Sequence, residues 1–219
     1  HYQLEKPDGA GPFPAVMMVP GCSGFDRELL KKHYDAVQSK FVKLGFVTLR
    51  VDYLAARSAD SCWPDVMTRE VADDICIAAE FLRQQPFVKE GTINLIGWSY
   101  GGGGALHALG RSQNRNPVQV DAMVVYYPYC REVKQKLDSE IPVFVLVGAV
   151  DNVAPLGECK DIFPTAPSHR PVIRVYEDAH HSFDFEELPA EMEYEFGTIG
   201  YNEAAAKAAW LEVIKFLRK

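Results

Sequence analysis

The stretch around Ser99 constrains the fold more than any other part of the sequence. Thr92 to Ile96 is a β-branched, apolar run typical of a buried parallel strand, and a helical pattern resumes at 105–109. Between them, Gly97-Trp98-Ser99-Tyr100-Gly101 fits the pattern G-x-S-x-G, in which a sharp strand-to-helix turn projects the serine hydroxyl from the end of a sheet. A glycine-rich turn with an incidental serine is the alternative, so the rest of the chain has to decide.

The glycines near Ser99 favour a tight turn over a flexible loop. A side chain at Gly97 or Gly101 would crowd the turn. Each glycine inside a helix costs about 0.5–1 kcal/mol relative to alanine, so the further run 102–104 implies a compensating close approach of backbone.

Length and charge limit the classes of function. With 219 residues, of which 47% are hydrophobic, the chain is expected to form a single domain over 1–219. A net charge of −7 without a basic cluster argues against partners such as nucleic acid or an anionic membrane, and no apolar run approaches the about 18 residues of a membrane span. A small molecule is therefore the expected partner.

The chain begins at His1, so we expect that an upstream segment was removed. The sequence leaves open the compartment, exported or cytoplasmic, and the oligomeric state.

Strand and helix patterns alternate along the chain. This alternation favours right-handed β-α-β connections, and it predicts an α/β fold with a mostly parallel central sheet covered by helices on both faces. Residues 1–12 are expected to form an end strand and a turn, and Thr68 is expected to be the N-cap of a helix that ends before Pro86. The other expected strands are 13–19, 46–51, 118–127, 142–147 and 171–176, and the other expected helices are 26–44 and roughly 202–217.

Two residue types suited to acid–base chemistry follow later strands. Asp151 comes directly after a strand, where its carboxylate could accept the ring N–H of a histidine. A loop aspartate that caps the next helix is an equal alternative for this segment alone. His180 and His181 follow the last strand, and histidine ionises near neutrality, so it can take a proton from a serine and return it to a leaving group.

Chain order links these residues. In α/β-hydrolases the nucleophile, the acid and the histidine occur in that order, each after a strand, and Ser99, Asp151 and His181 follow it. The first strand-to-helix turn, 20–24, stands where this fold donates one oxyanion-hole N–H, so the backbone N–H groups of Cys22 and Tyr100 are the candidate donors. The alternative for this turn is an ordinary connection in which Cys22 is a small buried residue.

Other candidate residues have weaker signals. Arg57 could bind a substrate carboxylate, although a surface ion pair is the commoner role of a loop arginine. Trp63, Trp98 and Tyr127 could line an apolar pocket or belong to the core. The five cysteines lack metal-ligand spacing, so no zinc site is expected; they are either reduced or joined in one or two disulfides of an exported protein.

Motifs along nearly the whole chain resemble the dienelactone hydrolase family of α/β-hydrolases. They are Gly-Pro-Phe-Pro-Ala-Val at 11–16, Pro-Gly-Cys-Ser-Gly at 20–24, Val-Asp at 51–52, Gly-Trp-Ser-Tyr-Gly-Gly at 97–102, Gly-x-x-Asp at 148–151 and Tyr-x-x-Ala-x-His-Ser-Phe at 176–183. The resemblance selects His181 over His180 as the catalytic histidine. From similar exported members it also implies a disulfide between Cys130 and Cys159.

The chain departs from the family at substrate-handling positions. Members that open dienelactones use a cysteine nucleophile, whereas position 99 is serine. They also carry a glutamate near the position of Gly21, and an arginine after the histidine where this chain has Asp184 and Phe185. The resemblance therefore implies hydrolase chemistry without implying a dienelactone substrate.

The sequence predicts a serine hydrolase that cleaves a carboxylic ester or a lactone through an acyl-enzyme. Ser99 is the expected nucleophile, His181 the base and Asp151 its orienting acid; no metal or organic cofactor is expected. The rival interpretations are a non-catalytic module that binds a small molecule or a protein in the same pocket, and an acyltransferase or peptidase on the same triad.

Overall fold

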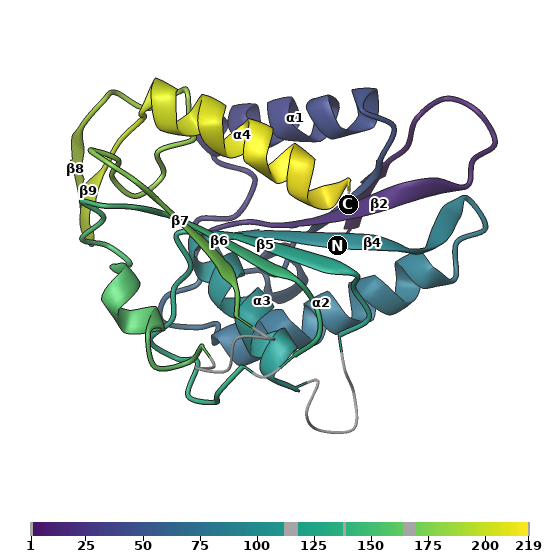
Figure 1. Ribbon diagram of the computed structural model, residues 1–219, viewed down its shortest axis with the longest axis horizontal. Helices are drawn as coiled ribbons and strands as arrows, with labels where there is room; N and C mark the ends of the chain where they lie inside the picture. Colours follow the sequence, from purple (N-terminus) through teal and green to yellow (C-terminus); the bar gives the residue numbers. More distant parts are fainter. Residues whose placement is uncertain (1, 112–117, 138, 164–169, 219) are drawn as a thin grey trace.

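A computed structural model describes residues 2–111, 118–137, 139–163 and 170–218, and its centre is a seven-stranded sheet (Figure 1). The strand order is β1-β3-β2-β4-β5-β6-β7. β1 is antiparallel to β3, and every other neighbouring pair is parallel. The strands are β1 (Tyr2–Glu5), β2 (Phe13–Val19), β3 (Val47–Val51), β4 (Val88–Trp98), β5 (Ala122–Tyr126), β6 (Val143–Gly148) and β7 (Val172–Tyr176).

Helices cover both faces of this sheet. Figure 1 shows α1 and α4 on one face and α2 and α3 on the other. Their bounds are α1 (Glu28–Lys43), α2 (Thr68–Arg83), α3 (Ser99–Arg111) and α4 (Glu203–Leu217), with 3-10 turns η1 (Ala55–Arg57) and η2 (Leu156–Cys159). A separate antiparallel hairpin, β8 (Met192–Tyr194) and β9 (Gly197–Ile199), precedes α4. Parallel strands bring their carboxyl ends to one edge of the sheet, which we call the carboxyl edge.

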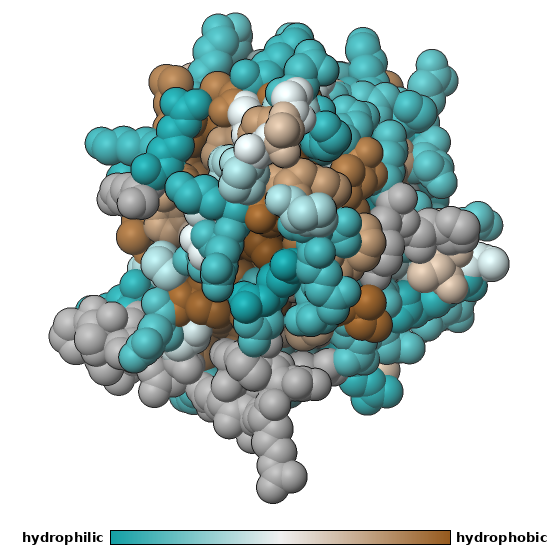
Figure 2. Space-filling model, turned by 90° about the vertical axis from the view of Figure 1, so that its right-hand side faces the viewer, coloured by the Kyte–Doolittle hydropathy of each residue, from teal (hydrophilic) through white to brown (hydrophobic). Residues whose placement is uncertain are grey.

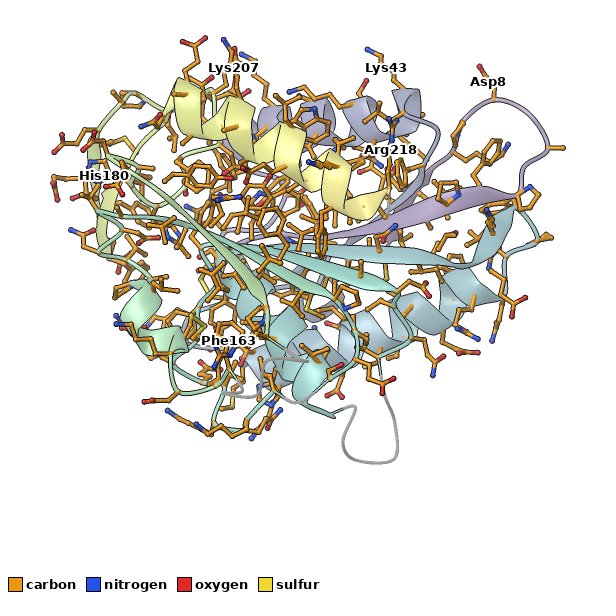
Figure 3. All side chains as sticks on the ribbon, in the orientation of Figure 1. Asp8, Lys43, Phe163, His180, Lys207 and Arg218 are labelled. Atoms are coloured by element: carbon orange, nitrogen blue, oxygen red, sulfur yellow. A yellow bond between two sulfur atoms is a disulfide. The ribbon has the colours of Figure 1, made fainter. Side chains whose placement is uncertain are left out.

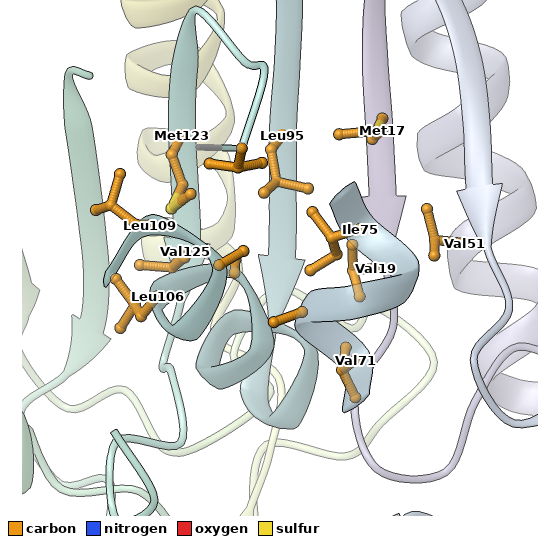
Figure 4. Close-up of a cluster of buried hydrophobic side chains, with 14 of the residues drawn as sticks. Met17, Val19, Val51, Val71, Ile75, Leu95, Leu106, Leu109, Met123 and Val125 are labelled. Atoms are coloured by element: carbon orange, nitrogen blue, oxygen red, sulfur yellow. The ribbon is translucent and has the colours of Figure 1, made fainter. Parts of the chain in front are cut away.

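Alternation along the buried strands divides the core in two. Successive strand residues point to opposite faces, so Ala15, Met17 and Val19 of β2 join the core beneath α2 and α3. Val16 and Met18 join the core beneath α1 and α4. Figure 4 shows the first of these cores, in which side chains of β2, β4 and β5 meet those of α2 and α3.

The sheet architecture predicted from sequence is confirmed, while some boundaries differ. The helix expected to start after a Thr68 cap begins at Thr68 itself, with Met67 as the N-cap, so that prediction is wrong by one residue. The reason is local: Glu70 accepts a hydrogen bond from the Met67 N–H at 2.8 Å, and the Thr68 N–H and hydroxyl both donate to Glu132 at 2.9 Å. The strand expected over 118–127 is shorter, 122–126, and the β8–β9 hairpin was not predicted.

Two disulfides link loops at the carboxyl edge. The expected bond between Cys130 and Cys159 is confirmed, with Cα atoms 5.2 Å apart. A second bond, between Cys22 and Cys62 with Cα atoms 4.8 Å apart, was not predicted. The interpretation of Cys22 as a small buried residue is thereby corrected, because Cys22 is partly exposed and its sulfur is bonded to Cys62.

The surface opposite the carboxyl edge is mainly hydrophilic, with apolar side chains visible between the charged ones (Figure 2). Among the described residues, no helix has both the length and the apolar content needed to cross a bilayer.

Candidate active site

Ser99 stands at the junction of β4 and α3 with a left-handed backbone, φ +48°. This region is strained for a residue with a side chain, and such strain is a feature of nucleophile elbows. The flanking glycines are sterically required. A Cβ at Gly97 would lie 2.8 Å from the Gly101 carbonyl oxygen, and one at Gly101 would overlap the carbonyl oxygen of Pro20.

A chain of hydrogen bonds joins the three residues predicted from sequence. His181 Nε2 lies 2.9 Å from Ser99 Oγ, and His181 Nδ1 lies 2.8 Å from Asp151 Oδ2. Because the carboxylate accepts from Nδ1–H, Nε2 is left as an acceptor for the serine hydroxyl. Both Asp151 and the His181 ring are nearly inaccessible to solvent, which strengthens their interaction.

Asp151 is held as an anion by its neighbours. Burial acts to raise its pKa, but hydrogen bonds from His181 and from two backbone N–H groups outweigh it, and the pKa lies below its ordinary value. Those N–H groups belong to Val153 and Ala154, at 2.9 and 2.8 Å from Oδ1. The backbone contacts also fix the carboxylate so that Oδ2 faces the histidine. The alternative interpretation of Asp151, the cap of the next helix, is wrong, because η2 begins at Leu156 with Pro155 as its N-cap and no side-chain cap.

The turn after β2 is clamped beside Ser99. The Gly21 N–H donates to the hydroxyl of Tyr34 at 3.1 Å, and the hydroxyl of Tyr53 donates to the Gly21 carbonyl at 2.7 Å. The Cys62 N–H donates to the Cys22 carbonyl at 2.8 Å, in addition to the disulfide. Within the described part of the chain, neither the Cys22 N–H nor the Tyr100 N–H donates a hydrogen bond, so both are free for an oxygen bound beside Ser99.

A buried carboxylate behind Ser99 links two elements of the site. Asp184 accepts hydrogen bonds from Trp98 Nε1 at 2.8 Å and from the Tyr127 hydroxyl at 2.5 Å. The Tyr127 ring lies 4.4 Å from the His181 ring between centroids. Burial raises the pKa of Asp184 to about 6, against the opposing effect of the bonds from Tyr127 and Trp98.

A cavity of about 340 Å³ opens over Ser99 and His181. Its size falls within the range of small-molecule sites. The start of α1 and the β8–β9 hairpin form two of its walls at the carboxyl edge, where Figure 3 labels His180, the neighbour of His181. Trp98 and Tyr127 line the cavity. This agrees with one of the two interpretations given for them from the sequence, the lining of an apolar pocket.

The other two predicted substrate-binding residues lie elsewhere. Arg57 pairs with Asp74 at 2.5 Å and donates to the Tyr53 carbonyl at 2.8 Å, and it does not line the cavity. Its contacts fit the interpretation as an ion-pair partner. Trp63 is 63% exposed and also stands outside the cavity wall. No group of His, Cys, Asp and Glu within the described ranges has an arrangement that could hold a metal ion.

The sequence matches the dienelactone hydrolase family over residues 2–219. The chain belongs to this family. No curated protein matches it. Solved structures resemble it at low identity, and they establish the α/β-hydrolase fold.

Three of these structures illustrate the likeness. A Klebsiella pneumoniae protein described as a dienelactone hydrolase has 19% identity and a TM-score of 0.76, with 100% of this chain and 92% of that chain covered. Thermogutta terrifontis esterase 2 with bound propionate has 16% identity and a TM-score of 0.68, covering 98% and 86%. Est1E of Butyrivibrio proteoclasticus with bound ferulic acid has 15% identity and a TM-score of 0.66, covering 100% and 96%.

Two residues at the site of this dienelactone hydrolase family member, Asp184 and Cys62, were not predicted from the sequence. Asp184 was noted only as a departure from the family, although an acid directly after the apolar Phe183 is an unusual choice for a buried segment. Nothing in the sequence identified Cys62 as the partner of Cys22, because pairing depends on how the loop at 52–65 returns to the sheet.

Proposed function

We propose that this family member hydrolyses carboxylic esters through a covalent acyl-enzyme on Ser99. The observation that carries the proposal is the continuous chain from Ser99 Oγ through His181 to Asp151, with distances of 2.9 and 2.8 Å. Membership of a hydrolase family supports the same reaction class.

In the first half-reaction Ser99 Oγ attacks the ester carbonyl carbon while His181 Nε2 takes the hydroxyl proton. The carbonyl oxygen becomes an oxyanion, which the N–H groups of Cys22 and Tyr100 stabilise. The carbon–oxygen bond to the alcohol then breaks, and Nε2 gives its proton to the departing oxygen. Asp151 stabilises the imidazolium throughout.

In the second half-reaction a water molecule repeats these steps on the acyl-enzyme. His181 takes a proton from the water, whose oxygen bonds to the acyl carbon. The tetrahedral intermediate collapses, the bond to Ser99 Oγ breaks, and the proton returns to the serine. The products are a carboxylic acid and an alcohol, and the enzyme needs no further reactant.

The test compares wild type with Ser99→Ala on p-nitrophenyl acetate. We expect kcat/KM to fall by at least about 10³-fold, because the nucleophile is lost while the binding groups remain. A phosphonate ester probe should label the wild-type protein at Ser99, as read by peptide mass spectrometry, and should leave the variant unlabelled. Equal turnover by the two proteins, with the variant folded, would contradict the mechanism; so would an unlabelled but folded wild type, which the binding-module interpretation predicts.

A further inference from the structure

The cavity over Ser99 has an exposed apolar rim formed by two elements. On one side is Leu29 of α1, 51% exposed; on the other are Met192, Tyr194 and Phe196 of the β8–β9 hairpin, with Phe196 47% exposed. The Tyr194 and Phe196 rings contact each other edge to face, 5.7 Å between centroids. A group of apolar side chains around a site, exposed to solvent, marks a surface that a ligand covers.

The hairpin is fastened to two loops of the site. The Gly200 N–H donates to the His181 carbonyl at 3.0 Å, and Ile199 forms a bridge with His181. The Thr198 N–H donates to Asn152 Oδ1 at 2.8 Å, directly beside Asp151. Gly197 has φ +142°, and a Cβ there would lie 2.6 Å from Asn152 Oδ1. The hairpin, which Figure 1 shows at the carboxyl edge of the sheet, is therefore fixed beside the histidine loop, and its side chains line part of the cavity.

The position of the histidine decides which part of an ester meets this wall. His181 Nε2 delivers its proton to the alcohol oxygen as the alcohol leaves, so the alcohol part has to lie on the His181 side. The turn that carries Cys22 and the start of α1 form other parts of the cavity wall. The hairpin therefore faces the alcohol part of the substrate.

The charges along the cavity argue against an anionic substrate. Among its described lining residues, Arg27 is the only lysine or arginine, whereas Glu28 and Glu187 are acids. Glu187 is nearly buried, and one of its oxygens has no hydrogen-bond partner. Arg57, the other candidate for binding a substrate carboxylate, pairs with Asp74 outside the cavity.

We propose that the β8–β9 hairpin makes the protein selective for uncharged esters whose alcohol part carries an aromatic or similarly bulky apolar group. The proposal rests on the proposed function, and it adds the substrate class and the element that selects it. Tyr194 and Phe196 are the specificity-determining residues, because their rings are the large apolar surfaces of the hairpin that stand at the cavity.

The experiment compares benzyl acetate with ethyl acetate, whose alcohols have similar acidity and whose acyl part is the same. The measured quantity is the ratio of kcat/KM for benzyl over ethyl acetate, from acid release in a pH-stat. Phe196→Ala and Tyr194→Ala each remove an aromatic contact with the benzyl group, so each should lower the ratio by about three- to tenfold. The matched control is Leu211→Ala, which removes a 70% exposed apolar side chain of α4 away from the cavity and should leave the ratio at its wild-type value.

A second comparison tests charge. 4-Carboxybenzyl acetate should have a kcat/KM about fivefold or more below that of benzyl acetate, because it brings a carboxylate among the acids of the cavity. Equal or faster turnover of the carboxylate would overturn this part of the proposal.

The outcomes separate this proposal from the function on which it rests. If ester hydrolysis depends on Ser99 but the benzyl-to-ethyl ratio is unchanged in both hairpin variants, the hairpin proposal is wrong and the hydrolase mechanism stands. If wild type and Ser99→Ala are equally active, the mechanism itself is wrong. Thermal melting of each variant checks that the hairpin substitutions leave the fold intact.

Discussion

At the scale of single residues, the site depends on groups that hold other groups in place. Ser99 projects from a strained backbone, His181 is fixed through Asp151, and the Cys22 N–H is aimed by a turn clamped between Tyr34 and Tyr53. Asp184 belongs to the same class: in the proposed mechanism it touches no reacting atom, and it accepts hydrogen bonds from Trp98, the neighbour of Ser99, and from Tyr127, whose ring lies against His181. We treat it as a positioning residue with an electrostatic effect.

Asp184→Asn tests this role through pH. With a pKa of about 6, raised by burial, the Asp184 carboxyl is mostly ionised at pH 8 and mostly protonated at pH 5. The ionised form favours the imidazolium that His181 becomes in the transition state. We therefore expect kcat of Asp184→Asn on p-nitrophenyl acetate to be about three- to tenfold below wild type at pH 8, and the two to converge as the pH falls through 6. His33, 3.5 Å from Asp184, stays neutral over this range because burial lowers its pKa to about 3.

A matched control is Asp178→Asn. Asp178 is an exposed acid of the loop after β7 with φ +53°, a conformation that asparagine tolerates, and its replacement should leave kcat unchanged at every pH. A ratio of wild type to Asp184→Asn that stays constant from pH 5 to 8 would mean that Asp184 supports only the packing.

The meeting of Ser99, Asp151 and His181 could be predicted because the signal of each residue is local in the sequence. Ser99 lies in a five-residue turn motif, and Asp151 and His181 each follow a short apolar strand in the chain order of the fold. Asp184 could not be predicted, because its partners come from the ends of β4 and β5 and meet only in three dimensions. Arg57 shows the converse. Its charge and its place in a loop suggested that it binds a substrate carboxylate, but its partner is Asp74 of α2.

At the scale of elements, glycines set the distance between α2 and α3. A Cβ at Gly104 would lie 2.5 Å from Val71 Cγ1 and 2.8 Å from its Cβ, with Val71 fully buried (the two helices are seen in Figure 4). The glycine run inside the helix predicted a close approach of backbone; at Gly103 the neighbour is the Tyr129 backbone, whereas at Gly104 it is the Val71 side chain of α2. The β8–β9 hairpin lacked any such signal, since each of its strands has only three residues and β8 is exposed.

Gly104→Ala tests this packing. Overpacking of a filled core costs about 1–3 kcal/mol, whereas alanine gains about 0.5–1 kcal/mol over glycine in a helix, so we expect a net loss of about 1–2 kcal/mol in the free energy of unfolding. In a Val71→Ala background the contact with Cγ1 disappears while the 2.8 Å contact with Cβ remains, so the same substitution should cost less than it does in wild type. Urea denaturation measures all four proteins of this cycle.

Gly157→Ala is the control for that cycle. A Cβ at Gly157 would have no atom within 4 Å, so the substitution should change the free energy of unfolding by less than about 0.5 kcal/mol. If Gly104→Ala costs as much in the Val71→Ala background as in wild type, contact between the two helices is not what the glycine permits.

At the scale of the whole molecule, alternation of strand and helix was sufficient to predict a mostly parallel sheet with helices on both faces. It could not give the strand order, in which β1 closes one edge antiparallel to β3, because that depends on pairing between segments far apart in the chain. The carboxyl edge then gathers the turn after β2, the elbow, the acid loop and the histidine loop into one site. Two disulfides cross-link loops at this edge, and such bonds persist in oxidising compartments.

The two disulfides should differ in function while resembling each other in stability. Removing either pair, as Cys22→Ser with Cys62→Ser or as Cys130→Ser with Cys159→Ser, opens loops of similar length, with sequence separations of 40 and 29. Each removal should lower the free energy of unfolding by about 2–4 kcal/mol. Only the first pair includes a candidate oxyanion donor, so only its removal should lower kcat on p-nitrophenyl acetate, by about three- to tenfold, because a mobile donor stabilises the oxyanion less well. Denaturation and kinetics on both double variants, below their melting temperatures, measure the two effects separately. Equal kcat values for the two would show that Tyr34 and Tyr53 hold the turn without help from the disulfide.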